Sequence, residues 1–187
     1  AVLTYLDDDG LPVEPIYYAP ILPMVLVNGA DGIGTGFSTK VLSYNKVEIA
    51  QWLEARLNPG SAGDILTRKF VPYYEGFTGT INEVSNNKFI VKGRYTVLKT
   101  DTVEITELPV GFWTMDFKEH LESLMGEGKS AKKAGLVKDY NDNSTDTVVN
   151  FVVTLAPGTV KKLESEMGDG FNGLEKLLKL FSYQTRS

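Results

Sequence analysis

The sequence predicts an α+β fold in which an antiparallel β-meander or mixed sheet packs with helices and follows a glycine-rich loop. Residues 76–108 contain short β-branched and aromatic runs separated by turn residues, which is typical of antiparallel strands. Residues 43–57 and 114–125 place apolar side chains at the spacing of an amphipathic helix. A strand meander followed by helix, strand and helix is an α+β arrangement.

Length and composition indicate a folded, soluble and intracellular protein. The 187 residues suffice for one domain, or for one domain and part of a neighbour. Hydrophobic residues make up 42% of the chain, so we expect a packed core. The absence of cysteine excludes disulfides and thiolate metal sites. The longest apolar run, residues 19–27, is too short to cross a membrane, and no secretion signal is present.

The charge distribution bears on possible partners. The net charge of −5 argues mildly against nucleic acid. The first 39 residues contain five acidic residues and no lysine or arginine. A DNA contact in this part would therefore depend on shape and apolar side chains. Because the chain starts in an apolar segment without methionine, we expect a fragment of a longer protein.

The N-terminal half is expected to contain a turn and a helix. Residues 6–10 predict a solvated turn rather than a metal site, because three consecutive aspartates point in different directions. A helix is expected over residues 43–57. Asn45 and Glu48 have the spacing of a capping box at its start. Its apolar stripe consists of Ile49, Trp52, Leu53 and Leu57.

The C-terminal half is expected to begin with a meander of three or four strands over residues 76–108. A helix over residues 114–125 ends at Gly126. The remaining predicted elements are a basic loop (126–138, with Lys129, Lys132, Lys133 and Lys138), a strand (146–155), a helix (157–167), a loop (168–173) and a short helix (174–178).

The glycine-rich loop follows the apolar run 21–27 and contains Gly29, Gly32, Gly34 and Gly36. A phosphate-binding P-loop requires a lysine directly after its second glycine, whereas the first lysine here is Lys40. The glycine spacing also differs from that of a dinucleotide site. Ile33 is an isolated apolar residue between two glycines. It either packs into the core or acts as a wedge between base steps, as in proteins that bend DNA.

No group of side chains forms a catalytic site in the sequence. His120, the single histidine, is expected at a solvated helix position. With one histidine and no cysteine, zinc and Cys-His chemistry are excluded. Arg94-Tyr95 has the order of a tyrosine nucleophile beside an activating arginine. Because the pair lies within a predicted strand, we expect a structural role.

Five segments of the sequence carry recognisable motifs: PILPMVLVNGADGIGTGFSTK (20–40), FTGTI (77–81), VEITELPVGFWT (103–114), DYNDNSTDTVVNFVV (139–153) and LLKLFSYQT (177–185). Together they resemble eukaryotic-type (type IIA) DNA topoisomerase II, a group that includes viral and protozoan enzymes. The segments follow the family's order and span nearly the whole chain, so the resemblance is more specific than any single motif.

The resemblance implies two domains and a DNA interface. Residues 1–44 would be the end of the winged-helix region, and residues 45–187 the tower domain. Together they would bind and bend the gate segment of double-stranded DNA for strand passage. Ile33 would intercalate between base pairs, and Trp113 would lie near DNA. The C-terminal DNA contacts would be Lys179, Leu180, Phe181, Ser182, Tyr183, Gln184, Thr185 and Arg186.

The resemblance also implies a complete enzyme, a homodimeric, ATP-hydrolysing isomerase that requires Mg²⁺ and ATP. It would act in the nucleus of a eukaryote, or in the host cytoplasm, host nucleus or virion of a virus. The family's catalytic tyrosine, acidic metal motifs and ATPase domain have no counterpart in this sequence. We therefore expect these 187 residues alone to be inactive, without a bound metal or cofactor.

Two departures from the family pattern weaken particular contacts. Gly111-Phe112 stands where many relatives carry a basic residue, and Asn143-Ser144 replaces an aromatic-histidine pair. Two other functions remain open from the residues, namely a non-enzymatic DNA-bending module and a protein-interaction domain.

Overall fold

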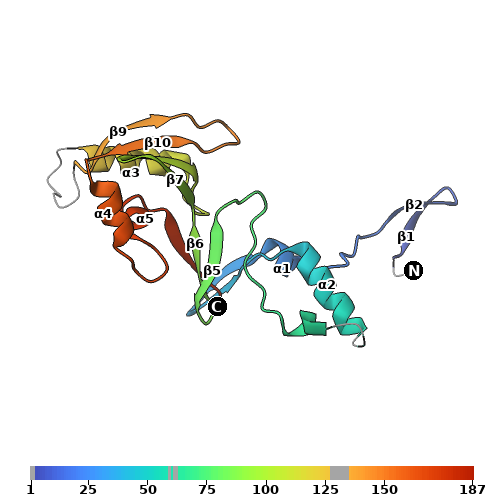
Figure 1. Cartoon of the computed structure of the whole chain (residues 1–187). Helices are drawn as coiled ribbons and strands as arrows, with labels where there is room; N and C mark the ends of the chain where they lie inside the picture. The colour runs from blue at the N-terminus through green and yellow to red at the C-terminus, as the bar shows by residue number, and fades with distance from the viewer. Residues whose placement is uncertain (1–2, 59, 61–62, 127–134) are drawn as a thin grey trace. The chain divides into compact units, whose positions relative to one another are not determined.

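The computed structural model describes residues 3–58, 60, 63–126 and 135–187 (Figure 1). The chain divides into two compact units, Ala1–Phe70 and Val71–Ser187. Antiparallel sheets and helices occur together, so the predicted α+β class is confirmed. The compact units differ in extent from the predicted domains 1–44 and 45–187, which remain a prediction.

The first unit begins with a hairpin of β1 (Tyr5–Asp8) and β2 (Leu11–Pro15). Of the predicted turn over residues 6–10, only residues 9–10 lie between these strands, since residues 6–8 belong to β1. Its Asp7 carboxylate accepts a hydrogen bond of 2.8 Å from the backbone N–H of Gly10. Asp7 therefore stabilises a local turn, as expected.

The glycine-rich segment is a second hairpin, so the expectation of a loop over residues 29–36 is wrong except at Gly29 and at the turn, residues 35–36. After the short helix α1 (Met24–Asn28), β3 (Ala30–Gly34) pairs antiparallel with β4 (Phe37–Val41). The two-residue connection contains Gly36 with a φ of 81°. Two-residue hairpin turns require positive φ angles that glycine adopts without strain.

Helix α2 (Lys46–Leu57) starts three residues later than predicted, because Asn45 is its N-cap. The Asn45 side chain accepts the backbone N–H of Val47 at 2.8 Å. The expected reciprocal contact from Glu48 is replaced by an ion pair of 4.0 Å with Arg68.

The apolar face of α2 is narrower than predicted. Ile49 is buried, and the half-buried Trp52 lies against the ring of Phe70 with centroids 6.4 Å apart. Leu57 is exposed, so its assignment to the stripe is wrong. The 3₁₀ helix η2 (Gly63–Thr67) follows and packs against α2.

The predicted meander consists of four strands that belong to two different sheets. β5 (Thr80–Ser85) and β6 (Lys88–Lys92) form one hairpin. β7 (Arg94–Lys99) and β8 (Thr102–Glu107) form another. The sheet orders are β11-β6-β5 and β7-β8-β10-β9. The prediction of a single continuous meander is therefore wrong.

Gly93 is the point at which the chain passes from one sheet to the other. Its N–H donates a 2.8 Å hydrogen bond to the carbonyl of Leu180. A Cβ at this position would collide with the backbone oxygen of Glu107. The crossing is therefore restricted to glycine by close backbone packing.

Helix α3 (Thr114–Met125) has the predicted bounds. The predicted strand 146–155 is shorter, because residues before β10 (Phe151–Leu155) form the loop that connects it to β9 (Val137–Asp142). Within that loop, the N–H of Asn143 donates to the carbonyl of Asn150 at 2.8 Å. Most of the predicted basic loop, including Lys129, Lys132 and Lys133, lies outside the described residues.

The remaining elements are α4 (Thr159–Ser165), α5 (Gly173–Leu177) and β11 (Phe181–Thr185). Helix α4 is two residues shorter at each end than the predicted helix 157–167. Helix α5 lies one residue earlier in the chain than the predicted helix 174–178. β11 has no counterpart among the predicted strands. It pairs antiparallel with β6, far away in the sequence.

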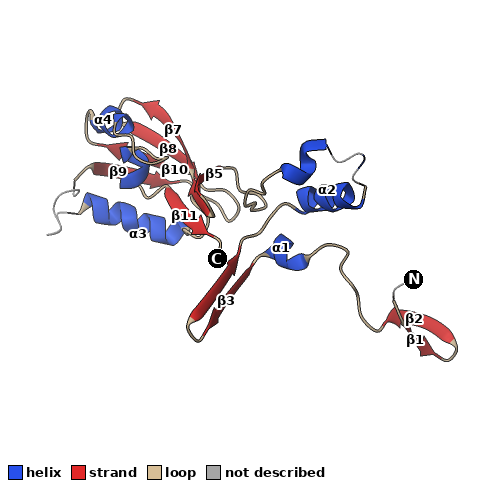
Figure 2. Cartoon of the chain, turned by 90° about the horizontal axis from the view of Figure 1, so that it is seen from below, coloured by secondary structure: helices blue, strands red, loops and turns tan. Residues whose placement is uncertain are grey.

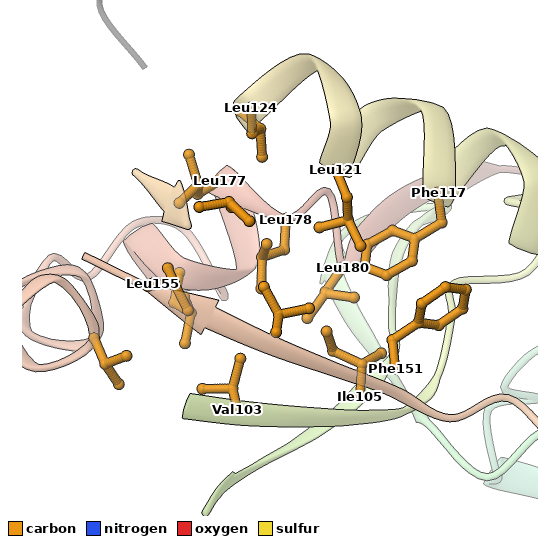
Figure 3. Packing of buried hydrophobic residues seen from close by; sticks show 14 of the residues in the cluster. Val103, Ile105, Phe117, Leu121, Leu124, Phe151, Leu155, Leu177, Leu178 and Leu180 are labelled. Atoms are coloured by element: carbon orange, nitrogen blue, oxygen red, sulfur yellow. The ribbon is translucent and has the colours of Figure 1, made fainter. Parts of the chain in front are cut away.

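The core of the second unit lies between the four-stranded sheet and the helices α3 and α5. Figure 3 shows Phe117 and Leu121 of α3 pointing toward the strands that carry Ile105 and Phe151. The rings of Phe117 and Phe151 meet edge to face with centroids 5.0 Å apart. This core fixes both ends of α3 and thereby the loop that precedes it.

Candidate nucleic-acid interface

The tip of the β3–β4 hairpin presents Ile33 to solvent. Figure 2 shows the two strands running away from α1 to this tip. Ile33 pairs with Ser38 across the hairpin, and the residue is 93% exposed. The alternative in which Ile33 packs into the core is therefore wrong. An exposed β-branched apolar side chain at a hairpin tip has the chemistry of an apolar wedge.

The four glycines of this segment fall into two pairs. Gly29 and Gly36 have φ angles of 73° and 81°, which L-residues rarely adopt. A Cβ on Gly29 would also lie 2.8 Å from the backbone oxygen of Val41. Gly32 and Gly34 have neither restriction, since an added Cβ would meet nothing within 4 Å at Gly32 and one atom at 3.8 Å at Gly34. Only Gly29 and Gly36 are thus required by the hairpin itself.

One cross-strand ion pair accompanies Ile33. Asp31 pairs with Lys40 in the register, and their charged atoms are 3.8 Å apart. Because alternate residues of a strand point to the same face, both side chains share the face of Ile33. Lys40 offers a cation to a phosphate on that face, although Asp31 offsets it.

Trp113 is exposed and occupies the N-cap position of α3, without a capping hydrogen bond from its side chain. It lines an open groove of about 580 Å³ together with other aromatic residues, including Tyr74, Phe77 and Phe112. The groove also contains Glu75, Glu107 and Asp146, and none of the described residues that line it is a lysine or an arginine. A contact between Trp113 and DNA would therefore rely on the indole ring.

Glu107 holds the two walls of this groove together. One carboxylate oxygen accepts the N–H and the hydroxyl of Thr78 at 3.1 and 2.9 Å. The other accepts the N–H of Leu108 at 3.2 Å. The residues that precede Trp113 are thereby attached to the start of the β5 segment.

In the C-terminal segment, residues 179–186, Leu180 is buried and the other residues are half-buried or exposed. Leu180 is fully buried in the core, so its side chain is unable to reach a partner. Phe181 stacks on Phe171 with centroids 4.2 Å apart. Ser182, Gln184 and Thr185 lie on β11 between these residues and the C-terminus.

Two cationic side chains, those of Lys88 and Arg186, have contact partners in the hairpin and strand that form the three-stranded sheet β11-β6-β5. Lys88 places its Nζ 4.1 Å from the ring centroid of Tyr183, a cation–π contact. Arg186 donates from Nε to the side chain of Asn87 at 2.7 Å and from its N–H to the Asn87 carbonyl at 3.0 Å. Arg186 is thus anchored to the β5–β6 turn.

A hollow of about 240 Å³ lies between two predicted parts of the DNA interface, the surroundings of Trp113 and the C-terminal segment 179–186. It is lined by Gly111 and Phe112, next to Trp113, and by Lys179, Phe181 and Ser182. Lys179 adopts a positive φ of 53° where α5 leads into β11. The structure therefore brings the loop before Trp113 and the start of the C-terminal segment together.

Tyr95 has a structural role, as the sequence indicates. Its hydroxyl donates to Glu164 at 3.0 Å and accepts from the amide of Asn172 at 2.8 Å. Burial is the largest cause that raises the pKa of Tyr95 to about 12; the bond from Asn172 opposes this and Glu164 adds to it. A nucleophilic tyrosine needs the opposite shift.

His120 is half-buried rather than solvated, so that expectation is wrong. Its Nε2 donates a 2.8 Å hydrogen bond to the carbonyl of Leu177 and thereby links α3 to the end of α5. Among residues 3–58, 60, 63–126 and 135–187, no three His, Cys, Asp or Glu side chains are grouped so as to hold a metal ion. Within the same residues, no helix combines the length and apolarity of a membrane span.

Comparison with known proteins identifies the family. The family model for the A-type subunit of DNA gyrase/topoisomerase IV matches residues 1–183. The chain belongs to this family. It is 40% identical over 181 residues to DNA topoisomerase 2 of Drosophila melanogaster, covering 97% of this chain and 12% of the relative. Identity to DNA topoisomerase 2 of Bombyx mori is 41% over 180 residues, 96% of this chain and 11% of the relative.

A solved structure supports the same assignment. The DNA-binding, cleavage and re-ligation domain of Plasmodium falciparum topoisomerase II matches with a TM-score of 0.76 and 36% identity, over 98% of this chain and 23% of that one. The resemblance to type II topoisomerases and the predicted fold class are thus confirmed. The chain spans about a tenth of the length of the curated relatives named above.

Phe37 is a further exposed apolar residue of the hairpin that the sequence did not single out. It follows Gly36 directly and is 83% exposed at the hairpin tip. The register of β3 and β4 places it on the face opposite to Ile33. The sequence signal for it was its position as a large aromatic residue directly after a segment with four glycines.

Proposed function

We propose that this chain is the part of a type IIA DNA topoisomerase that binds and bends the gate segment of double-stranded DNA. Residues 1–44 serve as the end of the winged-helix region and residues 45–187 as the tower domain. Family membership supports the assignment to a topoisomerase. The exposure of Ile33 at the tip of a narrow hairpin is the observation that supports bending.

The hairpin bends DNA because Ile33 enters a base step. Partial unstacking of one step costs a few kcal/mol, roughly, and is offset by the contacts that a bent duplex permits. A two-stranded ribbon is slender enough to approach a groove, and Gly32 and Gly34 add no side chains beside Ile33. The acidic start of the chain is consistent with an apolar contact rather than with phosphate binding.

The second unit supplies the remaining contacts in this proposal. Trp113 approaches the duplex with its ring. Lys179 and Arg186 contact phosphates, and the partly exposed residues Phe181, Ser182, Tyr183, Gln184 and Thr185 lie between them. We leave Leu180 out of the interface, because its side chain is buried in the core.

In the complete enzyme, we place the chemistry in other parts of the protein. A homodimer would cleave both strands with a tyrosine and Mg²⁺ and use ATP to drive strand passage, inside the cell and, in a eukaryote, in the nucleus. This chain's own residues would hold and shape the DNA during that reaction.

The test replaces Ile33 in the complete homodimeric enzyme. We expect Ile33→Ala to reduce the bend of a gate-length duplex, measured by FRET between its ends, and to reduce DNA cleavage. Ile21→Ala is the matched control, because Ile21 is 96% exposed and lies outside the hairpin. Thermal unfolding should be the same for both variants.

An unchanged FRET bend in Ile33→Ala would refute the wedge. A non-enzymatic DNA-bending module would show the bend without strand passage. Under the remaining alternative, a protein-interaction domain, duplex binding would be absent altogether.

A further inference from the structure

Phe37 occupies the face of the hairpin opposite to Ile33. It pairs with Gly34, whereas Ile33 pairs with Ser38, one position further along each strand. Since successive side chains point to opposite faces of a strand, Phe37 shares its face with Gly32, Gly34 and Thr39. The hairpin tip therefore carries a large apolar side chain on each face.

The exposure of Phe37 has no explanation within the hairpin. An aromatic ring opposite a glycine can stabilise a strand pair by lying over the glycine. Here a Cβ built on Gly34 would meet only the backbone oxygen of Phe37, at 3.8 Å, and no atom of its ring within 4 Å. Phe37 is 83% exposed, and its ring does not cover Gly34.

The surroundings of Phe37 are suited to a close and uncharged approach. The four residues of its face, Gly32, Gly34, Phe37 and Thr39, carry no charge that would repel phosphates. The two glycines leave the backbone bare beside the ring, although neither is required by its φ angle or by neighbouring atoms. The charged pair Asp31–Lys40 lies on the other face.

We propose that Phe37 is a second DNA-contact residue, which packs against deoxyribose rings and base edges of the groove wall facing Gly32 and Gly34. This inference rests on the proposed function, because it requires the hairpin to enter a groove of the gate duplex. Ile33 opens a base step from one face, and Phe37 fixes the ribbon against the opposite wall. The glycines let the backbone follow Phe37 into contact.

The role of Phe37 predicts a loss of affinity without a loss of stability. Burial of an exposed phenylalanine side chain contributes enough that Phe37→Ala should weaken binding to a gate-length duplex about tenfold. Phe37→Leu should retain part of the affinity, because it remains large and apolar. Gly34→Ala should also weaken binding, since its methyl group would stand between the ribbon and the groove wall.

The experiment uses the complete enzyme and measures duplex affinity by fluorescence anisotropy, bending by FRET and stability by thermal unfolding. Tyr18→Ala is the control, as Tyr18 is an exposed aromatic residue outside the hairpin. We expect Phe37→Ala and Gly34→Ala to lose affinity with melting temperatures that do not fall, while Tyr18→Ala binds like the wild type.

The outcomes separate this inference from the wedge. Wild-type affinity in both Phe37→Ala and Gly34→Ala, together with reduced bending in Ile33→Ala, would overturn the role of Phe37 and leave the proposed function in place. Unchanged binding and bending in all three variants would overturn both. A loss of affinity in Phe37→Ala together with unchanged bending in Ile33→Ala would support the Phe37 contact and reject Ile33 as the wedge.

Discussion

The ion pair between Lys92 and Glu175 should be a main support of the second unit. Nζ of Lys92 lies 2.8 Å from Oε1 of Glu175, and the two side chains are only 21% and 10% exposed. Lys92 ends β6 in the three-stranded sheet, whereas Glu175 lies on α5, whose leucines belong to the main core. The pair thus joins the two sheets through α5.

Glu175 also forms the start of α5. Its second oxygen accepts the N–H of Asn172 at 3.0 Å, and its own N–H donates to the Asn172 side chain at 2.8 Å. Lys92→Met would leave this nearly buried carboxylate without a cation. Removing one partner of a buried pair costs about 3–5 kcal/mol. The partial exposure of Lys92 admits some water, so we expect a loss near the lower limit, about 3 kcal/mol.

Such a loss is large compared with a total stability of roughly 5–15 kcal/mol. It corresponds to a decrease in Tm of about 6–12 °C for a chain of this size. Urea denaturation followed by circular dichroism would measure it. Lys118→Met is the matched control, because the pair of Lys118 with Asp142 is 3.6 Å long and more exposed. Exposed pairs contribute about 0–1 kcal/mol.

A double-mutant cycle isolates the interaction itself. Glu175→Gln keeps an acceptor for Asn172 and removes the charge, so Lys92→Met/Glu175→Gln should be less destabilised than the sum of the single variants. The reasoning would be refuted if Lys92→Met lost no more stability than Lys118→Met, or if the two effects were additive.

Two further predictions concern pH and salt. Because the folded-state pKa of Tyr95 is raised from 10.0 to about 12, the stability from its protonated hydroxyl is fully present below pH 10 and is lost as pH rises toward 12. The difference in unfolding free energy between wild type and Tyr95→Phe should shrink over that interval; a constant difference would contradict the shift. In the complete enzyme, Lys179→Ala and Arg186→Ala should each lower the slope of log K against log salt by about 0.9, whereas unchanged slopes would exclude phosphate contacts.

Helix α3 could be predicted from the sequence because its determinants are local. Phe117, Leu121 and Leu124 recur at helical spacing, and Gly126 follows the last turn. The predicted face also included Met125; the first three residues are buried, and Met125 is half-buried. The family was predicted from the resemblance of the five segments. Hydrophobic periodicity carries no information about family.

The division of the strands into two sheets could not be predicted, because it depends on distant partners. Gly93 marks a break in the sequence, but its hydrogen-bond acceptor, Leu180, lies near the other end of the chain. β11 was missed for the same reason, since its short segment becomes a strand only by pairing with β6. Strand preference depends strongly on such context.

The β3–β4 hairpin separates the requirements of folding from those of binding. Glycine in a strand is roughly 0.5–1 kcal/mol less favourable than alanine, and an isolated two-stranded hairpin is only marginally stable. Gly36 is needed for the turn, yet nothing in the described structure requires glycine at positions 32 and 34. A hairpin shaped only by its own stability would gain from side chains at both. The bare backbone beside Phe37 and Ile33 is therefore better explained by what the hairpin contacts, so Gly34→Ala should stabilise the fold and weaken binding at once.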